Sequence, residues 1–146
     1  MHVEGRGEFV LELFPNEAPL HVGSFLALAR SGCLVGQTVA AVGVDRGVVL
    51  RVPEGESAPT LLNAPLPPEV TRRTIARGSL LGVSGFESQL LGPPARGETA
   101  RQVRITLIPR PELEGSATCW GRVSMGMFVV DRLQPGDAVA AVEVID

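Results

Sequence analysis

Apolar and polar residues alternate over several short stretches of the chain, and this spacing predicts strands rather than long helices. In residues 8–14 (EFVLELF), apolar side chains lie between two glutamates, as in a strand with one buried face. A short first strand over 1–4 precedes it across a glycine-rich turn, and β-branched runs over 39–44 and 47–52 predict a second hairpin. Further strands are predicted over residues 79–83, 103–108, 118–124 and 138–145.

Two stretches follow helical spacing instead. In residues 18–31 apolar side chains recur at i, i+3, i+4 and i+7, which predicts an amphipathic helix ending before Gly32. Its expected buried stripe is Val22, Phe25, Leu26 and Ala29. A short helix is predicted over 127–133, and the proline-rich segment 53–68 is expected to be a loop. The chain is therefore predicted to be mainly β with two helices, in a closed barrel without exposed sheet edges.

Length and composition narrow the class of protein. With 146 residues and 45% hydrophobic residues, the chain is predicted to be a single domain over 1–146 with its own core, not a disordered segment. No apolar run approaches the ~18 residues that would span a bilayer, so no membrane association is expected. The N-terminus has no basic-then-apolar signal pattern, from which we expect a cytoplasmic location.

Charge and cysteine content exclude several kinds of site. A net charge of -3 argues against nucleic acid as a partner. The densest basic cluster, Arg72, Arg73 and Arg77, is interpreted as a solvated loop edge, with an acidic partner as the alternative. Cys33 and Cys119 lack C-x-x-C spacing and are expected to be buried free thiols. No metal or cofactor is predicted.

Motifs along the whole chain resemble one family. Residues 7–19 (GEFVLELFPNEAP) and the helix after them are similar to the strand, acidic turn, A-P dipeptide and helix of the cyclophilin-type peptidyl-prolyl isomerases. Near the C-terminal end, 113–115 (LEG), 120–123 (WGRV) and 126–131 (GMFVVD) resemble the family's L-D-G, F-G-x-V and G-M-x-V-V-D motifs. The resemblance implies an eight-stranded antiparallel cyclophilin-like barrel capped by two α-helices.

The resemblance also implies a reaction, rotation about an X-Pro peptide bond, whose resonance barrier is ~18–20 kcal/mol. The family binds the proline ring in an apolar pocket, and an arginine donates toward the imide nitrogen. In this sequence the position of that arginine is Ala41, and its neighbouring histidine is Ala40. No residue is therefore predicted to be catalytic.

The pocket positions have changed as well. In the family's Q-F-F-I strand, Gln102 is retained, one aromatic is Val103, and the pocket-floor phenylalanine is Arg104. Leu113 matches an apolar lining position, whereas the tryptophan before it, which the family uses to bind cyclosporin, is Glu112. The peptide-binding candidates in this degenerate groove around Ala41 are Gln102, Val103, Arg104 and Leu113. The aromatic content of only 4% fits this loss of pocket side chains.

These changes favour a cyclophilin-like protein-binding or assembly module that has lost most isomerase activity, a pseudoenzyme whose partner is a protein or a proline-containing segment. The first alternative is a weak or divergent isomerase assisting protein folding, in which Arg104, Arg46 or Arg51 replaces the missing arginine. The second is a small-molecule-binding barrel.

Overall fold

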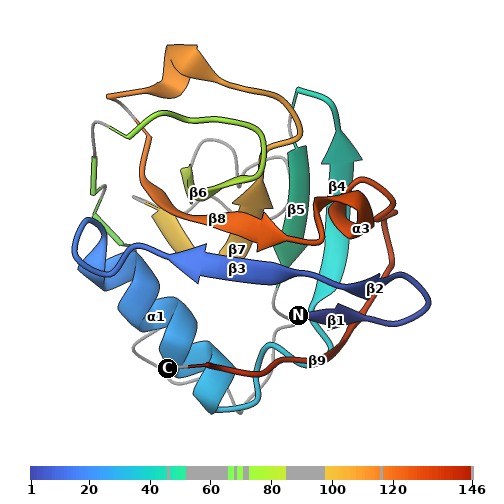
Figure 1. Cartoon of the computed structure of the whole chain (residues 1–146). Coiled ribbons are helices and arrows are strands. Elements are labelled where there is room, and N and C mark those ends of the chain that lie inside the picture. The colour runs from blue at the N-terminus through green and yellow to red at the C-terminus, as the bar shows by residue number, and fades with distance from the viewer. Residues whose placement is uncertain are drawn as a thin grey trace.

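The computed structural model of the chain describes residues 1–45, 47–51, 66–67, 69–70, 73–84, 98–115 and 117–145 (Figure 1). The strands of this part of the chain form two antiparallel sheets. The larger sheet has six strands, in the spatial order β3 (Val10–Leu13), β8 (Cys119–Met125), β6 (Ser79–Ser84), β7 (Glu98–Ile105), β5 (Gly47–Arg51) and β4 (Thr38–Gly43). The smaller sheet orders β2 (Gly7–Glu8), β1 (His2–Val3) and β9 (Val139–Ala141).

Two α-helices and one 3₁₀ turn accompany the sheets in the part of the chain that the structure describes. They are α1 (Pro19–Arg30), α3 (Met127–Val130) and η2 (Pro111–Leu113). In Figure 1, α1 lies below the end of β3 on one side of the molecule, and α3 lies on the opposite side. The prediction of a mainly β fold with two helices is confirmed in these residues. Within the described residues, neither helix has the length and apolar character needed to cross a membrane.

Hydrogen bonds at the edges join the two sheets. A β-bridge connects Thr38 at the start of β4 to Ala138, just before β9. At the other junction, Phe9 lies between β2 and β3 and exchanges backbone hydrogen bonds with Met1, whose ammonium donates to the Phe9 carbonyl over 2.7 Å. The predicted strand 8–14 is therefore divided at Phe9, because this residue pairs with the smaller sheet while Val10 begins the larger one.

The main core lies on one face of the six-stranded sheet, where α1 packs. Alternate residues of the central strands, including Leu50, Leu80 and Val103, are buried there, and the rings of Phe25 and Trp120 lie 5.0 Å apart. The buried residues of α1 are His21, Val22, Phe25 and Leu28. Leu26 and Ala29, predicted as part of the stripe, are only partly buried at its margin, so the helix is turned slightly from the predicted orientation.

A carboxylate from a distant segment caps α1. Ala18 provides no side-chain cap, and the Glu69 carboxylate accepts hydrogen bonds from the backbone N–H groups of Leu20 (3.1 Å) and His21 (2.8 Å). It also contacts His21 Nδ1 at 2.7 Å, while the Glu69 N–H donates to Thr118 Oγ1. Burial raises the pKa of Glu69, but these hydrogen bonds outweigh it, and the net pKa lies below the usual 4.5. Ionised Glu69 therefore stabilises the start of α1.

We expect Glu69→Gln to lower the free energy of unfolding by about 1–2 kcal/mol at neutral pH, because a charged cap becomes a neutral one. Since the folded-state pKa is depressed, this stabilisation is present above pH 4.5 and is lost as the pH falls through the folded-state pKa. Urea denaturation at several pH values measures the difference. Glu4→Gln, at an exposed position between β1 and β2, is the control. If Glu69→Gln lowers the free energy of unfolding by the same amount at pH values where the Glu69 carboxyl is fully protonated, ionised Glu69 is not the cap of α1.

Candidate functional site

Three strands bring the predicted site residues onto the face of the sheet opposite the main core. In the ladders, Ala41 lies opposite Val49, Val49 opposite Arg104, and Arg51 opposite Gln102. Directly opposed residues in antiparallel strands share a face, so these five residues form two adjacent rows. A register shift between Val39 and Ala41 makes this possible, because Val39 points into the core while Ala41 points away from it. We call Ala41, Val49, Arg51, Gln102 and Arg104 the arginine face.

Arg104 is almost fully buried on this face and is hydrogen-bonded to the backbone. Only 7% of the residue is exposed, between the buried side chains of Val49 and Leu81 on the neighbouring strands. Its Nη2 donates to the carbonyl oxygen of Asp45, in the turn between β4 and β5, over 3.2 Å. Arg110 Nη1 donates to the same carbonyl. The guanidinium of Arg104 is thus directed to the backbone of the turn.

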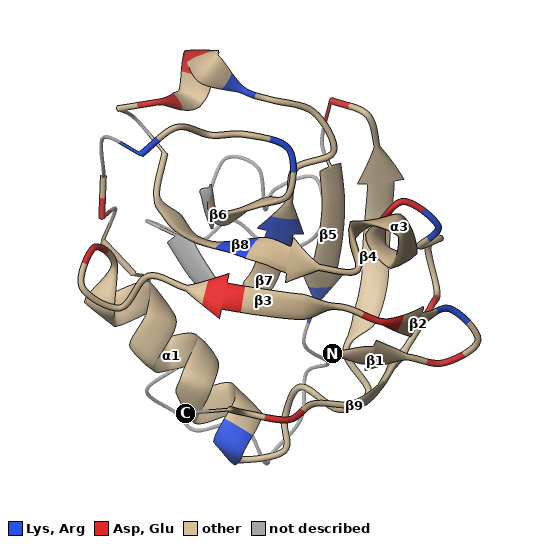
Figure 2. Cartoon of the chain, in the orientation of Figure 1, with Lys and Arg blue, Asp and Glu red and all other residues tan. Residues whose placement is uncertain are grey.

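Arg51 and Gln102 form the second row. Gln102 is also only 7% exposed. Its amide oxygen faces Arg51 and accepts two hydrogen bonds from the guanidinium. Arg51 Nε donates over 3.3 Å and Nη2 over 3.1 Å. Figure 2 shows basic positions on both β5 and β7. Gln102 therefore holds the half-buried guanidinium of Arg51 in place on this face.

The structure separates the remaining candidates from these rows. Val103 points to the opposite face, where it is 2% exposed in the main core, and it has no access to a ligand on the arginine face. Leu113 packs in η2 against a second apolar cluster, on the same side of the sheet as Arg104. That cluster contains Phe14, Ile75, Leu81 and Cys119. Ala41, Gln102 and Arg104 are thus brought together, with Leu113 at one side of the group.

Glu112 is exposed beside this cluster. Its carboxylate pairs with Arg110 Nε, and this hydrogen bond holds the pKa of Glu112 below its usual range. An ionised carboxylate therefore lies where the resemblance places an indole. Sequence reasoning missed the role of Arg110, which also connects η2 to the β4–β5 turn. No local pattern signals a contact between residues 65 positions apart.

Other candidates from the sequence have structural roles. Arg73 pairs with Glu17 and lies over the ring of Phe14, and Arg77 pairs with Asp131, so both are engaged within the chain. Burial raises the pKa of the Cys119 thiol, while Cys33 is half-buried, and neither cysteine forms a disulfide. Arg46 and Arg72 lie outside the described residues. Within the described residues, no three His, Cys, Asp or Glu side chains cluster as a metal site would need.

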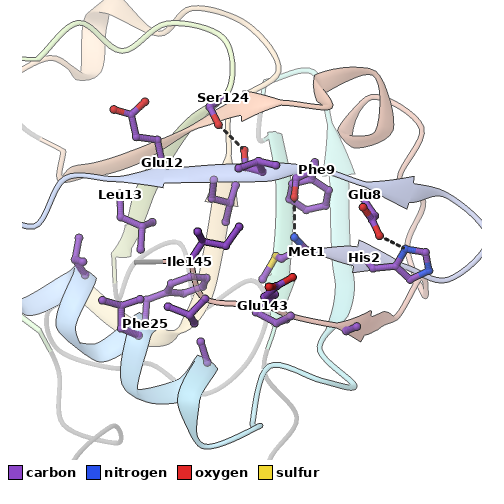
Figure 3. A pocket seen from close by; sticks show the side chains of 18 of the residues that line it. Met1, His2, Glu8, Phe9, Glu12, Leu13, Phe25, Ser124, Glu143 and Ile145 are labelled. Carbon is purple, nitrogen blue, oxygen red and sulfur yellow. Dashed lines mark hydrogen bonds and ion pairs between the residues drawn. The ribbon is translucent and has the colours of Figure 1, made fainter.

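A cavity of about 740 Å³ lies away from the arginine face, between α1, β3 and the segment after β9. In Figure 3, Leu13 and Phe25 face it from β3 and α1, and Met1 and Ile145 lie at its side. None of the residues of the arginine face lines this cavity.

Comparison with known proteins decides the family. The family model for cyclophilin-type peptidyl-prolyl cis-trans isomerases matches residues 1–145. The chain belongs to the cyclophilin family. Among solved structures, cyclophilin AquaCyp293 from Hirschia baltica superposes with a TM-score of 0.72 at 16% identity, over 96% of this chain and 70% of that one. No protein of curated function matches the sequence.

A second similar structure was solved in the presence of a dipeptide. It is the cyclophilin-type isomerase of Cryptosporidium parvum in the presence of the dipeptide Ala-Pro, with a TM-score of 0.61 and 20% identity. The match covers 92% of this chain and 87% of that one. At this level of identity, both structures establish only that this cyclophilin shares their fold.

We expect this cyclophilin not to bind cyclosporin, because Glu112 is charged at the position where the family has an indole. Isothermal titration with cyclosporin is the measurement. A dissociation constant below about 1 µM would refute the expectation. Glu112→Trp, which places an indole at this position, is the matched variant, and we expect any gain in affinity for cyclosporin to appear in it.

Proposed function

We propose that this cyclophilin is a protein-binding domain that has lost most of its isomerase activity. The observation that carries the proposal is the hydrogen bond from the Arg104 guanidinium to the Asp45 carbonyl. On the same face, residue 41 is an alanine and offers no donor. An isomerase stabilises the twisted imide with a donor aimed at its nitrogen and with an apolar seat for the proline ring. A guanidinium at the floor of a pocket weakens the binding of an apolar ring, because removing water from the guanidinium costs several kcal/mol.

What remains on this face is suited to holding a peptide. Gln102 and Arg51 present hydrogen-bonding groups beside the alanine and valine of β4 and β5. The dipeptide named for the Cryptosporidium parvum relative supports a proline-containing protein segment as the partner. A reducing cytoplasmic location is part of the proposal, supported by two cysteines that remain thiols.

A second candidate function has one observation in its favour. Arg51 keeps N–H groups that Gln102 does not use, so a divergent isomerase with Arg51 as donor is the competing account. Arg104 is the less favoured donor, because the Asp45 carbonyl engages it.

One NMR titration with an acetylated Ala-Ala-Pro-Ala amide peptide tests the proposal. We expect amide signals of β4, β5 and β7 to shift on binding, while cis–trans exchange of the peptide keeps its uncatalysed rate. Accelerated exchange that disappears in Arg51→Ala would support the competing account. Shifts confined to other strands would reject the arginine face as the binding surface.

A further inference from the structure

The free edge of β3 borders the cavity between α1 and the sheet. Among the described strands, β3 is at the end of the larger sheet and pairs with β8 alone. On this strand line the N–H of Phe14 donates to the Trp120 carbonyl, so Phe14 and Glu12 direct their backbone groups toward β8. Leu11 and Leu13 therefore direct theirs to the other side, where no hydrogen bond among the described residues uses them. An unpaired strand edge thus faces the cavity that both leucines line.

Residues 142–145 form the opposite border of the cavity and continue the line of β9. Their two valines are half-buried, whereas Glu143 and Ile145 are exposed, which is the alternation of a strand. The sequence predicts a strand over 138–145, but the observed one ends at Ala141. The prediction is wrong beyond this residue because a strand needs a neighbour for its backbone groups, and no described strand pairs with this segment.

The smaller sheet shows what would fit between the two borders. There β1 lies between β2 and β9 and is antiparallel to both. Met1 exchanges hydrogen bonds with Phe9, which directly precedes β3. The line of β1, extended past Met1, therefore runs between β3 and the segment after β9, as Figure 1 shows. One extended segment on this line would be antiparallel to both borders.

The floor of the cavity is apolar and incompletely covered. Val22 and Phe25 of α1 are buried there, whereas Leu26 and Ala29 of the same helix are half-buried. All four belong to the stripe that the sequence predicts to be buried. The cavity volume of about 740 Å³ is in the range of sites that bind ligands. The inward side chains of an added strand would supply the cover that Leu26 and Ala29 lack.

The outer rim of the cavity is acidic. Glu12 and Glu143 lie at exposed positions on the two borders. Glu12 pairs with Arg122, whereas no ion pair among the described residues involves Glu143. Outward side chains of an added strand would lie between these two carboxylates, and opposite charges at neighbouring cross-strand positions attract. The rim therefore favours a basic residue.

We propose that this gap, which is bordered by residues 11–13 and 142–145 and which we call the strand slot, binds an extended segment of a partner protein by β-strand addition. The segment runs antiparallel to β3 and hydrogen-bonds to the backbone of Leu11 and Leu13. Its apolar residues face α1 and alternate with basic residues on the side of Glu143. The strand slot is separate from the arginine face, so this inference goes beyond the proposed function and stands without it.

Two peptides of equal composition test the inference. They are acetylated amides of Lys-Val-Lys-Val-Lys-Val-Lys and Lys-Lys-Val-Val-Val-Lys-Lys, titrated into the full chain and followed by amide NMR. We expect the first to bind at least about fivefold more tightly, because only its valines all point to one side of an extended chain. At saturation, hydrogen exchange of the Leu11 and Leu13 amides should slow at least about tenfold, because both become hydrogen-bonded. Glu12, whose amide already faces β8, should keep its rate.

Two variants of α1 show whether the peptide occupies the slot. Ala29→Phe fills the slot from the helix and should weaken the alternating peptide at least about fivefold. Ala27→Phe adds the same ring at an exposed position outside the cavity and should leave its affinity unchanged. If Ala29→Phe does not fold, Glu143→Gln replaces it as the test. Exchanging the lysines of the peptide for glutamines should weaken binding about two- to fivefold in the unaltered chain, and less than about twofold in Glu143→Gln.

Several results would overturn the inference. They are the absence of binding, equal affinity of the two peptides, unchanged exchange at Leu11 and Leu13, or an affinity that survives Ala29→Phe. Signal shifts confined to the arginine face would place the peptide there instead. Slow exchange at both leucines before peptide is added, with the mass of a dimer in sedimentation, would assign the slot to a second copy of this chain. None of these results measures proline exchange, so the proposed function would be unaffected by this failure.

Discussion

The double variant Ala41→Arg, Arg104→Phe is expected to show isomerase activity about 100-fold above that of the unaltered chain. Ala41 lies on the arginine face, directly across the ladder from Val49, and Arg104 is the next residue in that row. The two changes together restore a donor at position 41 and an apolar ring on the floor. Loss of a single donor of this kind typically costs about 10²–10³ in rate, so its return should recover a similar factor. Exchange NMR on a proline peptide measures the rate of cis–trans interconversion at a fixed concentration of each variant.

The single variants show whether both changes are needed. Ala41→Arg alone should gain less, because Arg104 still places a charge where the proline ring would lie. Arg104→Phe alone should gain little, because it lacks the donor. The Arg104→Phe change removes one of two hydrogen bonds to the Asp45 carbonyl, and Arg110 retains the other. A folded double variant with no activity would show that this face lacks more than these two groups.

Gly47→Ala is expected to destabilise the fold by more than about 3 kcal/mol. Gly47 begins β5 with φ +77°, a conformation that side chains disfavour. A Cβ added there would also collide with the carbonyl oxygen of Ile105 and approach Thr106 Cα to 3.2 Å, so the backbone of β7 would have to move. Because β5 and β7 carry the arginine face, peptide binding should weaken in parallel. Urea denaturation gives the free energy of unfolding.

Gly5→Ala is the matched control for this variant. Gly5 has a similar φ of +74°, but a Cβ there has open space around it. We expect only the backbone cost of about 1 kcal/mol. Equal losses in the two variants would mean that the contact with Ile105 contributes nothing, and that the close approach of β5 and β7 is adjustable.

Local patterns predicted most of the elements. The helix expected over 18–31 is observed as Pro19–Arg30, and the hairpin expected over 39–44 and 47–52 as Thr38–Gly43 and Gly47–Arg51. These elements are set by apolar periodicity and by glycine or proline at their ends, which depend on neighbouring residues alone. The family motifs predicted a degenerate groove around Ala41, Gln102 and Arg104, and the ladders place these three residues on one face of the sheet.

Contacts between distant segments escaped prediction. The Glu69 cap on α1 joins residues 48 positions apart, and nothing near Leu20 or His21 indicates it. The strand break at Phe9 follows from its pairing with Met1, and the orientation of Arg104 follows from the Asp45 carbonyl. Each depends on where another part of the backbone lies. The strand on which a residue lies was therefore predictable, whereas the partner that engages its side chain was not.

The most direct test of the proposed loss of isomerase chemistry is two-dimensional exchange NMR on a proline peptide in the presence of the unaltered chain. An uncatalysed X-Pro bond interconverts over tens of seconds or longer. We predict that this rate is unchanged when the peptide is bound, with the double variant at positions 41 and 104 as the positive comparison. Interconversion within about one second, abolished by Arg51→Ala or Arg104→Ala, would contradict the account and establish this divergent cyclophilin as a working isomerase.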